Sequence, residues 1–257
     1  MGHRTWSLVL ILTLMGGLSL SAPPPQSQEE IEEALKIYNR AKYLHQERNY
    51  EEAIKEYQRA ALLDKENPFI FNYMGLAFLA LGQHESAQKA FTQALKLNPN
   101  LTDVHNNLGA LYSEMGNTEA AFKEFTQVVR DPSFPTPEKP LYNMGDLYLR
   151  EGNLELALMH FRRAIEKNPN FALGYRGLGK VHVALNEPEI AIDYLEKALQ
   201  RASNDQDSLY ELARIYDGMG DTDRAQDYYR RVVEVDRFSA LGRLSLQRLD
   251  ALKGTSE

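Results

Sequence analysis

The segment Gly174–Lys180, which reads GYRGLGK, comes nearest to a motif with known chemistry. Its first and sixth residues are glycine and its seventh is lysine, which is the spacing of a phosphate-binding loop. In such a loop Ser or Thr follows the lysine and coordinates the metal, but here Val181 follows it, and no strand pattern precedes the segment. Because the motif works only between a strand and a helix, these glycines are predicted to serve packing instead.

The other titratable residues do not form a ligand or catalytic set. The six histidines include no pair spaced i, i+4 and no other metal-ligand spacing, so we expect no metal site. The absence of cysteine excludes disulfides, thiolate ligands and a cysteine nucleophile. Acidic side chains are expected on solvated helix faces, in pairs such as Glu51 with Lys55. The sequence therefore predicts no catalytic residue and no cofactor, and a protein that is not an enzyme.

The overall charge argues against a nucleic-acid partner. The 257 residues include 36 acidic and 29 basic side chains, giving a net charge of −7 and a pI near 5.5. Binding to phosphate backbones requires clustered Lys and Arg that this balance does not supply. An acidic surface favours a basic protein partner or serves solubility.

The first 22 residues differ from the rest of the chain. A basic start is followed by an uncharged, largely apolar run from Trp6 to Ala22. This pattern is typical of an export signal, and the small residues near its end would allow cleavage after Ser21. A retained anchor helix is the alternative, because about 17 apolar residues lie at the lower limit for spanning a bilayer. We expect an exported protein, in the periplasm or associated with the envelope, that contacts a membrane only if residues 1–22 are retained.

A repeat of about 34 residues runs through the remainder. A small residue recurs at intervals of 34, 34, 36, 34 and 34, at Ala41, Gly75, Gly109, Gly145, Gly179 and Ala213. Twelve residues after each lies an alanine, at Ala53, Ala87, Ala121, Ala157, Ala191 and Ala225. A large residue follows each alanine after four positions, at Tyr57, Phe91, Phe125, Phe161, Leu195 and Tyr229. Small side chains permit close helix approach and large ones fill the gaps, so the pattern predicts antiparallel helix pairs that bury their faces by stacking.

This pattern resembles the tetratricopeptide repeat (TPR) family over about residues 34–238. The resemblance implies an all-α, right-handed α-solenoid of six helix pairs, at 34–67, 68–101, 102–137, 138–171, 172–205 and 206–238. Residues 23–33 are expected to form a linker and the start of the first helix, with Ser27 and Glu30 as a capping box. An amphipathic leucine stripe predicts a capping helix within 239–257.

One interval is two residues longer than the others. It contains DPSFPTPEKP at residues 131–140, where four prolines prevent the preceding helix from continuing. A tolerated loop insertion and a family marker are both consistent with this segment.

The resemblance also implies where a protein partner would bind. In TPR proteins the first helix of each pair lines a concave groove, although the convex face of a solenoid can also serve. Amides and tyrosines suit peptide recognition there, because amides bond a ligand backbone and tyrosine offers a large contact area. The groove positions of pairs two to six hold Phe69, Asn72, Asn106, Asn107, Ser113, Glu114, Tyr142, Asn143, Asp146, Arg150, Arg176, Lys180, Tyr210, Glu211, Arg214 and Asp217.

Three features together resemble the pilotin family of type IV pilus biogenesis, the PilF/PilW type. They are residues 106–109 (NNLG), the Asp131-Pro132 insertion and residues 142–145 (YNMG). The resemblance implies a scaffold of the bacterial envelope that helps a secretin subunit to assemble or to reach the outer membrane. Such pilotins are usually lipoproteins, but this chain has no cysteine to carry the lipid. A generic periplasmic or secreted TPR adaptor for another envelope or secretion complex is the alternative.

Overall fold

The computed structural model describes residues 27–254, and this part of the chain contains thirteen α-helices and no strand. The segment 1–22, expected to be a signal or anchor, lies outside the described residues. The helices are α1 (Gln28–Gln46), α2 (Tyr50–Leu63), α3 (Pro68–Ala80), α4 (His84–Leu97), α5 (Thr102–Glu114), α6 (Thr118–Arg130), α7 (Glu138–Arg150), α8 (Leu154–Lys167), α9 (Ala172–Ala184), α10 (Pro188–Arg201), α11 (Gln206–Gly218), α12 (Thr222–Val235) and α13 (Ala240–Gly254).

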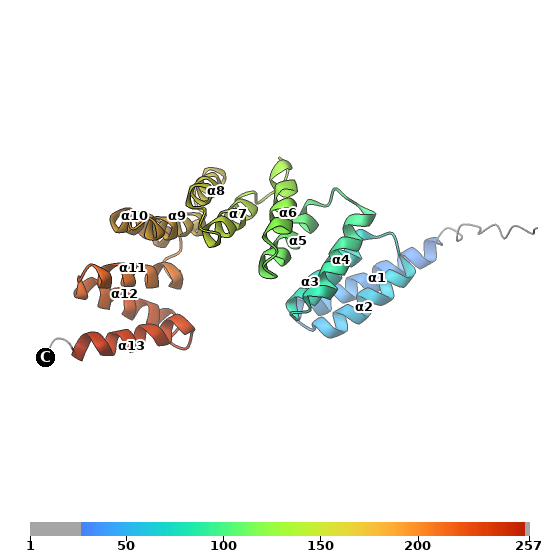
Figure 1. Ribbon diagram of the computed structural model, residues 1–257. Helices are drawn as coiled ribbons and strands as arrows, with labels where there is room; N and C mark the ends of the chain where they lie inside the picture. The colour runs from blue at the N-terminus through green and yellow to red at the C-terminus, as the bar shows by residue number, and fades with distance from the viewer. Residues whose placement is uncertain (1–26, 255–257) are drawn as a thin grey trace, which may run out of the picture.

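The helices form six antiparallel pairs that stack into an arch (Figure 1). Each helix packs most extensively on its partner within the pair and next on the following helix. The first helices of successive pairs also touch, from α1 to α3 and onward to α9. In Figure 1, α7 and α9 lie toward the hollow of the arch, and α8 and α10 lie outside it. The predicted all-α solenoid with a capping helix is confirmed, and α13 covers α12 and α11 at the C-terminal end.

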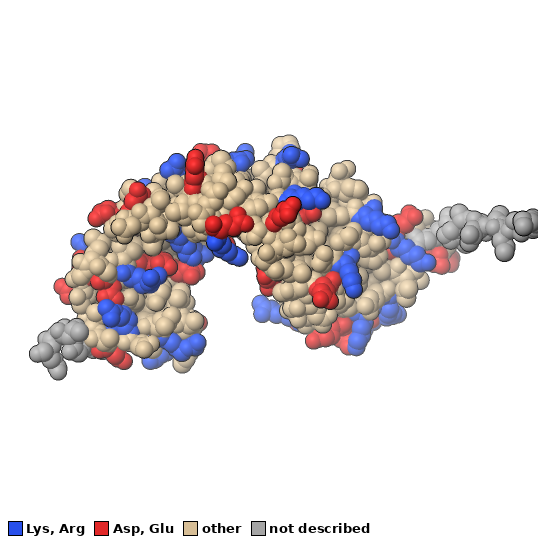
Figure 2. All heavy atoms as spheres, in the orientation of Figure 1, with Lys and Arg blue, Asp and Glu red and all other residues tan. Residues whose placement is uncertain are grey.

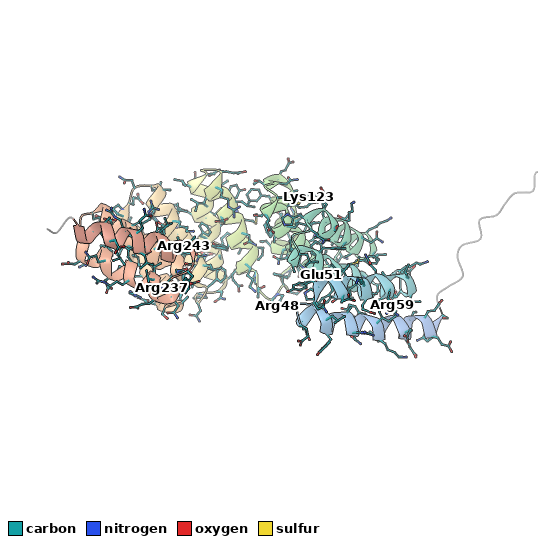
Figure 3. The ribbon with its side chains drawn as sticks, turned by 90° about the horizontal axis from the view of Figure 1, so that it is seen from below. Arg48, Glu51, Arg59, Lys123, Arg237 and Arg243 are labelled. Carbon is teal, nitrogen blue, oxygen red and sulfur yellow. The ribbon has the colours of Figure 1, made fainter. Side chains whose placement is uncertain are left out.

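A residue with a left-handed backbone conformation follows the first helix of every pair. Four of these residues are glycines with φ between 68° and 79°, at Gly82, Gly116, Gly152 and Gly220. Arg48 and Asn186 occupy the equivalent places in pairs one and five, each with φ 59°. Figure 3 shows Arg48 at this turn, far from Arg237 and Arg243 at the other end of the arch. The turn geometry is therefore constant through the solenoid although the residue type is not.

The core repeats one packing contact along the molecule. The six alanines of the repeat are fully buried, and so are the large residues that follow them, except Tyr229 at 3% exposure. A Cβ added at Gly75 would lie 2.6 Å from the ring of Phe91, and one at Gly145 would lie 2.8 Å from that of Phe161. Small residues are therefore required where the two helices of a pair cross, as the repeat predicted.

The glycines of the GYRGLGK segment lie within α9 and serve the same purpose. A Cβ at Gly174, Gly177 or Gly179 would come within 2.5, 2.5 and 2.7 Å of Ile165, Phe161 and Leu195, respectively. All three glycines are buried between neighbouring helices. Their spacing is explained by helix packing on both sides of α9, in agreement with the sequence interpretation.

The proline-rich insertion forms the connection between α6 and α7. Its Phe134 is 8% exposed and anchors the segment to the core. The Asp131 carboxylate accepts hydrogen bonds from Thr102 Oγ1 at 2.5 Å and from Ser133 Oγ at 2.6 Å. The bonds from Ser133 and Thr102 hold the pKa of the Asp131 carboxyl below its usual value. The insertion is thus fixed to the start of α5, which opens the same pair.

His105 joins three elements and gives the fold a pH dependence. Its Nδ1 lies 2.6 Å from Glu124 Oε2 on α6, and its Nε2 lies 2.9 Å from the carbonyl oxygen of Pro99. The hydrogen bond to Glu124 raises the pKa of His105 above 6.5, against the opposing effect of burial. A raised folded-state pKa means that the stabilisation is complete below 6.5 and is lost as pH rises through the raised value. We expect His105→Ala to lower the free energy of unfolding most at acidic pH, as measured by urea titrations across a pH series.

His160 supplies a control of opposite sign. Its ring is 5% exposed and stacks on Tyr148, and burial is the main cause that lowers its pKa to about 4. Stability from this group is complete above 6.5 and declines as pH falls toward 4, because the unfolded chain then binds the proton more readily. His160→Phe should therefore remove the decline in the free energy of unfolding that this group causes as pH falls toward 4. Equal effects of His105→Ala at all pH values would contradict the assignment of a protonated His105.

Candidate protein-binding groove

The hollow of the arch is an open groove lined by the first helices of the pairs. Figure 2 shows it as a deep recess between the two ends of the molecule, with mixed acidic and basic side chains at its margins. These helices end in the constant turn and keep one face against their partners, so the opposite face is presented to the groove. The groove residues named from the sequence divide into three regions with different chemistry.

The N-terminal region is aromatic. Phe69 on α3 is 50% exposed, and Tyr73 lies one turn further along the same helix. The Tyr73 ring centroid lies 5.8 Å from that of Tyr38 on α1, and the Lys42 ammonium lies 5.1 Å from the Tyr73 centroid. Leu35, one turn before Tyr38, is 53% exposed. We call Leu35, Tyr38, Phe69 and Tyr73 the aromatic strip.

Three of the strip's residues were missing from the sequence-based set. Leu35 and Tyr38 hold the same offsets in pair one that selected groove residues in the later pairs, so the repeat could have identified them. Tyr73 holds the equivalent offset in pair two. Without these three residues, the groove predicted from the repeat offsets is too short at its N-terminal end.

The central region is a set of amides that hold successive pairs together. Asn107 Nδ2 donates to Asn72 Oδ1 at 3.2 Å, and Asn72 is only 8% exposed. The Oδ1 atom of Asn106 is buried without a hydrogen-bond partner. Ser113 and Asn143 are half-buried, whereas Glu114 is exposed and lies 3.4 Å from His84 Nε2. Asn72 therefore contributes to contacts between repeats more than to open surface.

Tyr142 and Arg176 also make contacts that stabilise the packing of the helices. The Tyr142 ring centroid lies 5.4 Å from that of the buried Phe161. Arg176 is 13% exposed, and its Nη1 lies 2.5 Å from Asp205 and 2.9 Å from Asp207 at the start of α11. The sequence placed Arg176 in the groove as a partner-binding residue. The structure shows that it joins the fifth pair to the sixth, and its contact with a partner stays a prediction.

The C-terminal region carries exposed charge. Arg150 pairs with Asp146 one turn away on α7, and Lys180 is half-buried on α9. Tyr210 packs its ring 6.0 Å from that of Tyr229. Arg214 is exposed, and its Nη1 contacts Glu211 at 3.4 Å. This end of the groove therefore offers guanidinium groups where the N-terminal end offers aromatic rings.

The described helices meet neither the requirements of a metal site nor those of a membrane span. Between residues 27 and 254 the structure places no group of three or more His, Asp or Glu side chains where they could hold a metal ion. None of the helices in this same range combines the length and apolar composition needed to cross a bilayer. The described part of the molecule presents a long concave surface with aromatic, amide and charged sections in succession.

The repeats are recognised by family models. The model described as TPR repeat matches residues 42–82 and 75–116. Two models described as tetratricopeptide repeat match residues 139–171 and 175–237. Together these matches cover more than half of the chain. The chain belongs to the tetratricopeptide repeat family. It is a scaffold of the kind that binds other proteins along a curved surface.

Curated relatives share the repeats over a small part of their own length. The protein CTR9 homolog of Arabidopsis thaliana is 29% identical over 133 residues, and bimA of Emericella nidulans is 28% identical over 98 residues. The matches cover 46% and 38% of this TPR chain and 12% of each relative. This TPR chain thus corresponds to one stretch of repeats within much longer proteins.

Two solved structures match most of the chain. The crystal structure of PilW, described as a widely conserved type IV pilus biogenesis factor, has a TM-score of 0.74 and 21% identity, covering 83% of this chain and 98% of PilW. PilF of Pseudomonas aeruginosa has a TM-score of 0.72 and 18% identity, covering 86% of this chain and all of PilF. At these identities the likeness establishes a common fold.

Proposed function

We propose that this TPR protein is a bacterial envelope scaffold that holds a secretin subunit in its groove during type IV pilus biogenesis. The observation that carries the binding role is the aromatic strip, in which Phe69 on α3 is 50% exposed. Large aromatic side chains exposed on a concave surface are typical of protein-binding anchors. No chemistry is required of the scaffold.

The pilus role draws on the fold and on the sequence. Six pairs with one capping helix match PilW and PilF over nearly their whole length. The insertion between the third and fourth pairs and the flanking NNLG and YNMG segments support the same assignment. The apolar run at residues 6–22 supports export, and without cysteine the proposed route to the envelope is a soluble form or a retained N-terminal anchor.

Loss of the Phe69 ring should strongly reduce capture of the partner. We expect tagged full-length protein to recover a secretin as the dominant prey from detergent-solubilised bacterial envelopes, identified by mass spectrometry. Phe69→Asp should reduce that recovery at least roughly tenfold, because a charge replaces an apolar anchor at the interface. Its melting temperature should change little, since the side chain is 50% exposed.

Phe238→Asp is the matched control. Phe238 is 78% exposed in the connection before α13, outside the aromatic strip, so the same substitution should leave recovery unchanged. Recovery of other envelope proteins without a secretin would replace the pilus role by a general envelope adaptor. Undiminished secretin recovery by Phe69→Asp would show that the partner binds elsewhere.

A further inference from the structure

Two adjacent pockets lie on either side of α11 at the C-terminal end of the groove. The first, of about 520 Å³, lies between α11 and the capping helix α13. The second, of about 280 Å³, lies between α11 and the turn that joins α9 to α10. Arg214 and Gly218 line both pockets. The two pockets thus meet at these two residues of α11.

The first pocket is suited to a carboxylate. Its one acidic residue, Asp217, is bound in bidentate fashion by Arg248, with Nε at 2.6 Å and Nη2 at 2.8 Å. Tyr229 also donates to Asp217 at 3.3 Å, and the hydrogen bonds and charge of Arg248 lower the pKa of that carboxyl. Because Asp217 is already neutralised, Arg214 at the edge of the pocket is a guanidinium available to a ligand. Its side chain is 57% exposed, and its ion pair with Glu211 is long, at 3.4 Å.

The second pocket is suited to an apolar side chain. Its walls include Val183, Pro188, Ile215 and Met219, and Met219 is 51% exposed. Glu187 also lines this pocket, but its carboxylate lies 2.6 Å from His182 Nδ1. The second pocket has two acidic residues, Glu187 and Glu211, beside Arg214. The first pocket has Arg214 and Arg248 and a single acid, which Arg248 already binds, so a ligand carboxylate is drawn to the first pocket.

Gly218 lies where the two pockets meet. It is the last residue of α11, with φ outside the left-handed range, and a Cβ added to it would meet no atom within 4 Å. The helix would gain stability from almost any other residue, because glycine is among the weakest helix formers. Neither packing nor backbone conformation accounts for glycine here, in contrast to Gly145 or Gly179. Its effect is a low ridge at the point where the two pockets join.

We infer that the double pocket across α11 binds a peptide segment of the partner that carries a carboxylate close to an apolar side chain. The carboxylate lies against Arg214 in the first pocket, and the apolar side chain fills the second. The peptide backbone crosses the ridge over Gly218, where a larger residue would block it. This inference rests on the proposed function only in taking the partner to be a protein.

Synthetic peptides test the pocket without knowledge of the partner. The probes are fluorescein-labelled Gly-Ser peptides with an amidated C-terminus that contain one Leu and one Glu, the Glu being the only charged residue, separated by spacers of increasing length. Fluorescence anisotropy with the full chain should find a spacer at which binding is saturable. Replacing the peptide's Glu by Gln should then weaken binding at least roughly tenfold, because the charge-assisted bond to Arg214 is lost.

Two variants locate the site, and two serve as controls. Arg214→Gln should weaken binding of the Glu peptide roughly tenfold and leave the Gln peptide unaffected. Gly218→Met should abolish binding of both peptides while the melting temperature stays the same or rises, because methionine favours the helix. Arg230→Gln, an equal charge change on α12 outside both pockets, should leave binding unchanged, and so should Phe238→Asp.

The outcomes separate this inference from the proposed function. If no peptide in the series binds, or if Gly218→Met binds as the wild type does, the double pocket is not a ligand site, whatever the envelope capture shows. If the peptides bind as expected but no secretin is recovered from envelopes, the pocket stands and the pilus role is wrong.

Discussion

Phe161→Ala is expected to lower the free energy of unfolding by about 3–5 kcal/mol. Phe161 is fully buried, and its ring lies between two first helices. A Cβ at Gly145 on α7 would be 2.8 Å from it, and one at Gly177 on α9 would be 2.5 Å from it. Removal of the ring therefore opens a cavity between the fourth and fifth pairs that the facing glycines have no side chains to fill. Urea unfolding followed by circular dichroism measures the loss.

Phe238→Ala is the matched control for this cavity. It removes the same ring from a position that is 78% exposed, so the change in unfolding free energy should stay within about 0.5 kcal/mol. In a solenoid each pair contacts only its neighbours, so a defect at the middle can also separate the transition into two steps. A single transition with a loss below about 1 kcal/mol for Phe161→Ala would mean that the helices close around the missing ring.

The register of the core could be predicted from the sequence because one contact recurs in every pair. An alanine followed four residues later by a large side chain places both on the same helix face, and this occurs six times. From the sequence, the left-handed turns can be predicted only in the four pairs where glycine marks them. Arg48 and Asn186 adopt φ 59° because the stacking of the flanking helices imposes the turn, and no local residue preference indicated it.

The residues that face the groove could be predicted from the sequence. Which of their side chains are bonded to a neighbouring pair could not. Offsets within the repeat specify which way a residue points, and on that basis Phe69 and Arg214 were correctly expected to be accessible. Whether a side chain is engaged depends on residues about 30 positions away in the next pair. Asn72 is bonded by Asn107, and Arg176 by Asp205. Such pairs are set by the stacking geometry between repeats.

The pockets beside α11 show the same limit. Arg214 and Tyr210 were expected in the groove from the register alone. The first pocket, however, needs α13 as its second wall, and a stripe of leucines predicts a helix without fixing where that helix packs. Arg248 is therefore a groove residue that repeat offsets could not have named, because it lies beyond the last repeat.

Arg176→Met should destabilise the junction between the fifth and sixth pairs by about 3–5 kcal/mol. The Arg176 side chain and that of Asp205 are each 13% exposed, and the nitrogen–oxygen distance between them is 2.5 Å. Asp205 also accepts from the backbone N–H of Ser208 at 3.2 Å, which caps α11. Methionine preserves the apolar stem but leaves a nearly buried carboxylate without its cation, which costs more than the lost bond itself. Urea unfolding measures the loss.

A second substitution distinguishes the effect of the unpaired Asp205 carboxylate from that of a packing defect. Adding Asp205→Asn to Arg176→Met removes that charge and keeps an acceptor for Ser208, so most of the lost stability should return. Lys180→Met, which deletes a half-buried cation from the same helix, should cost at most about 1 kcal/mol. A loss for Arg176→Met no larger than that for Lys180→Met would contradict the bridge. If the ion pair holds, reduced partner capture by Arg176 variants reports separation of the last two pairs, whereas Phe69 and Arg214 variants report contact with the partner.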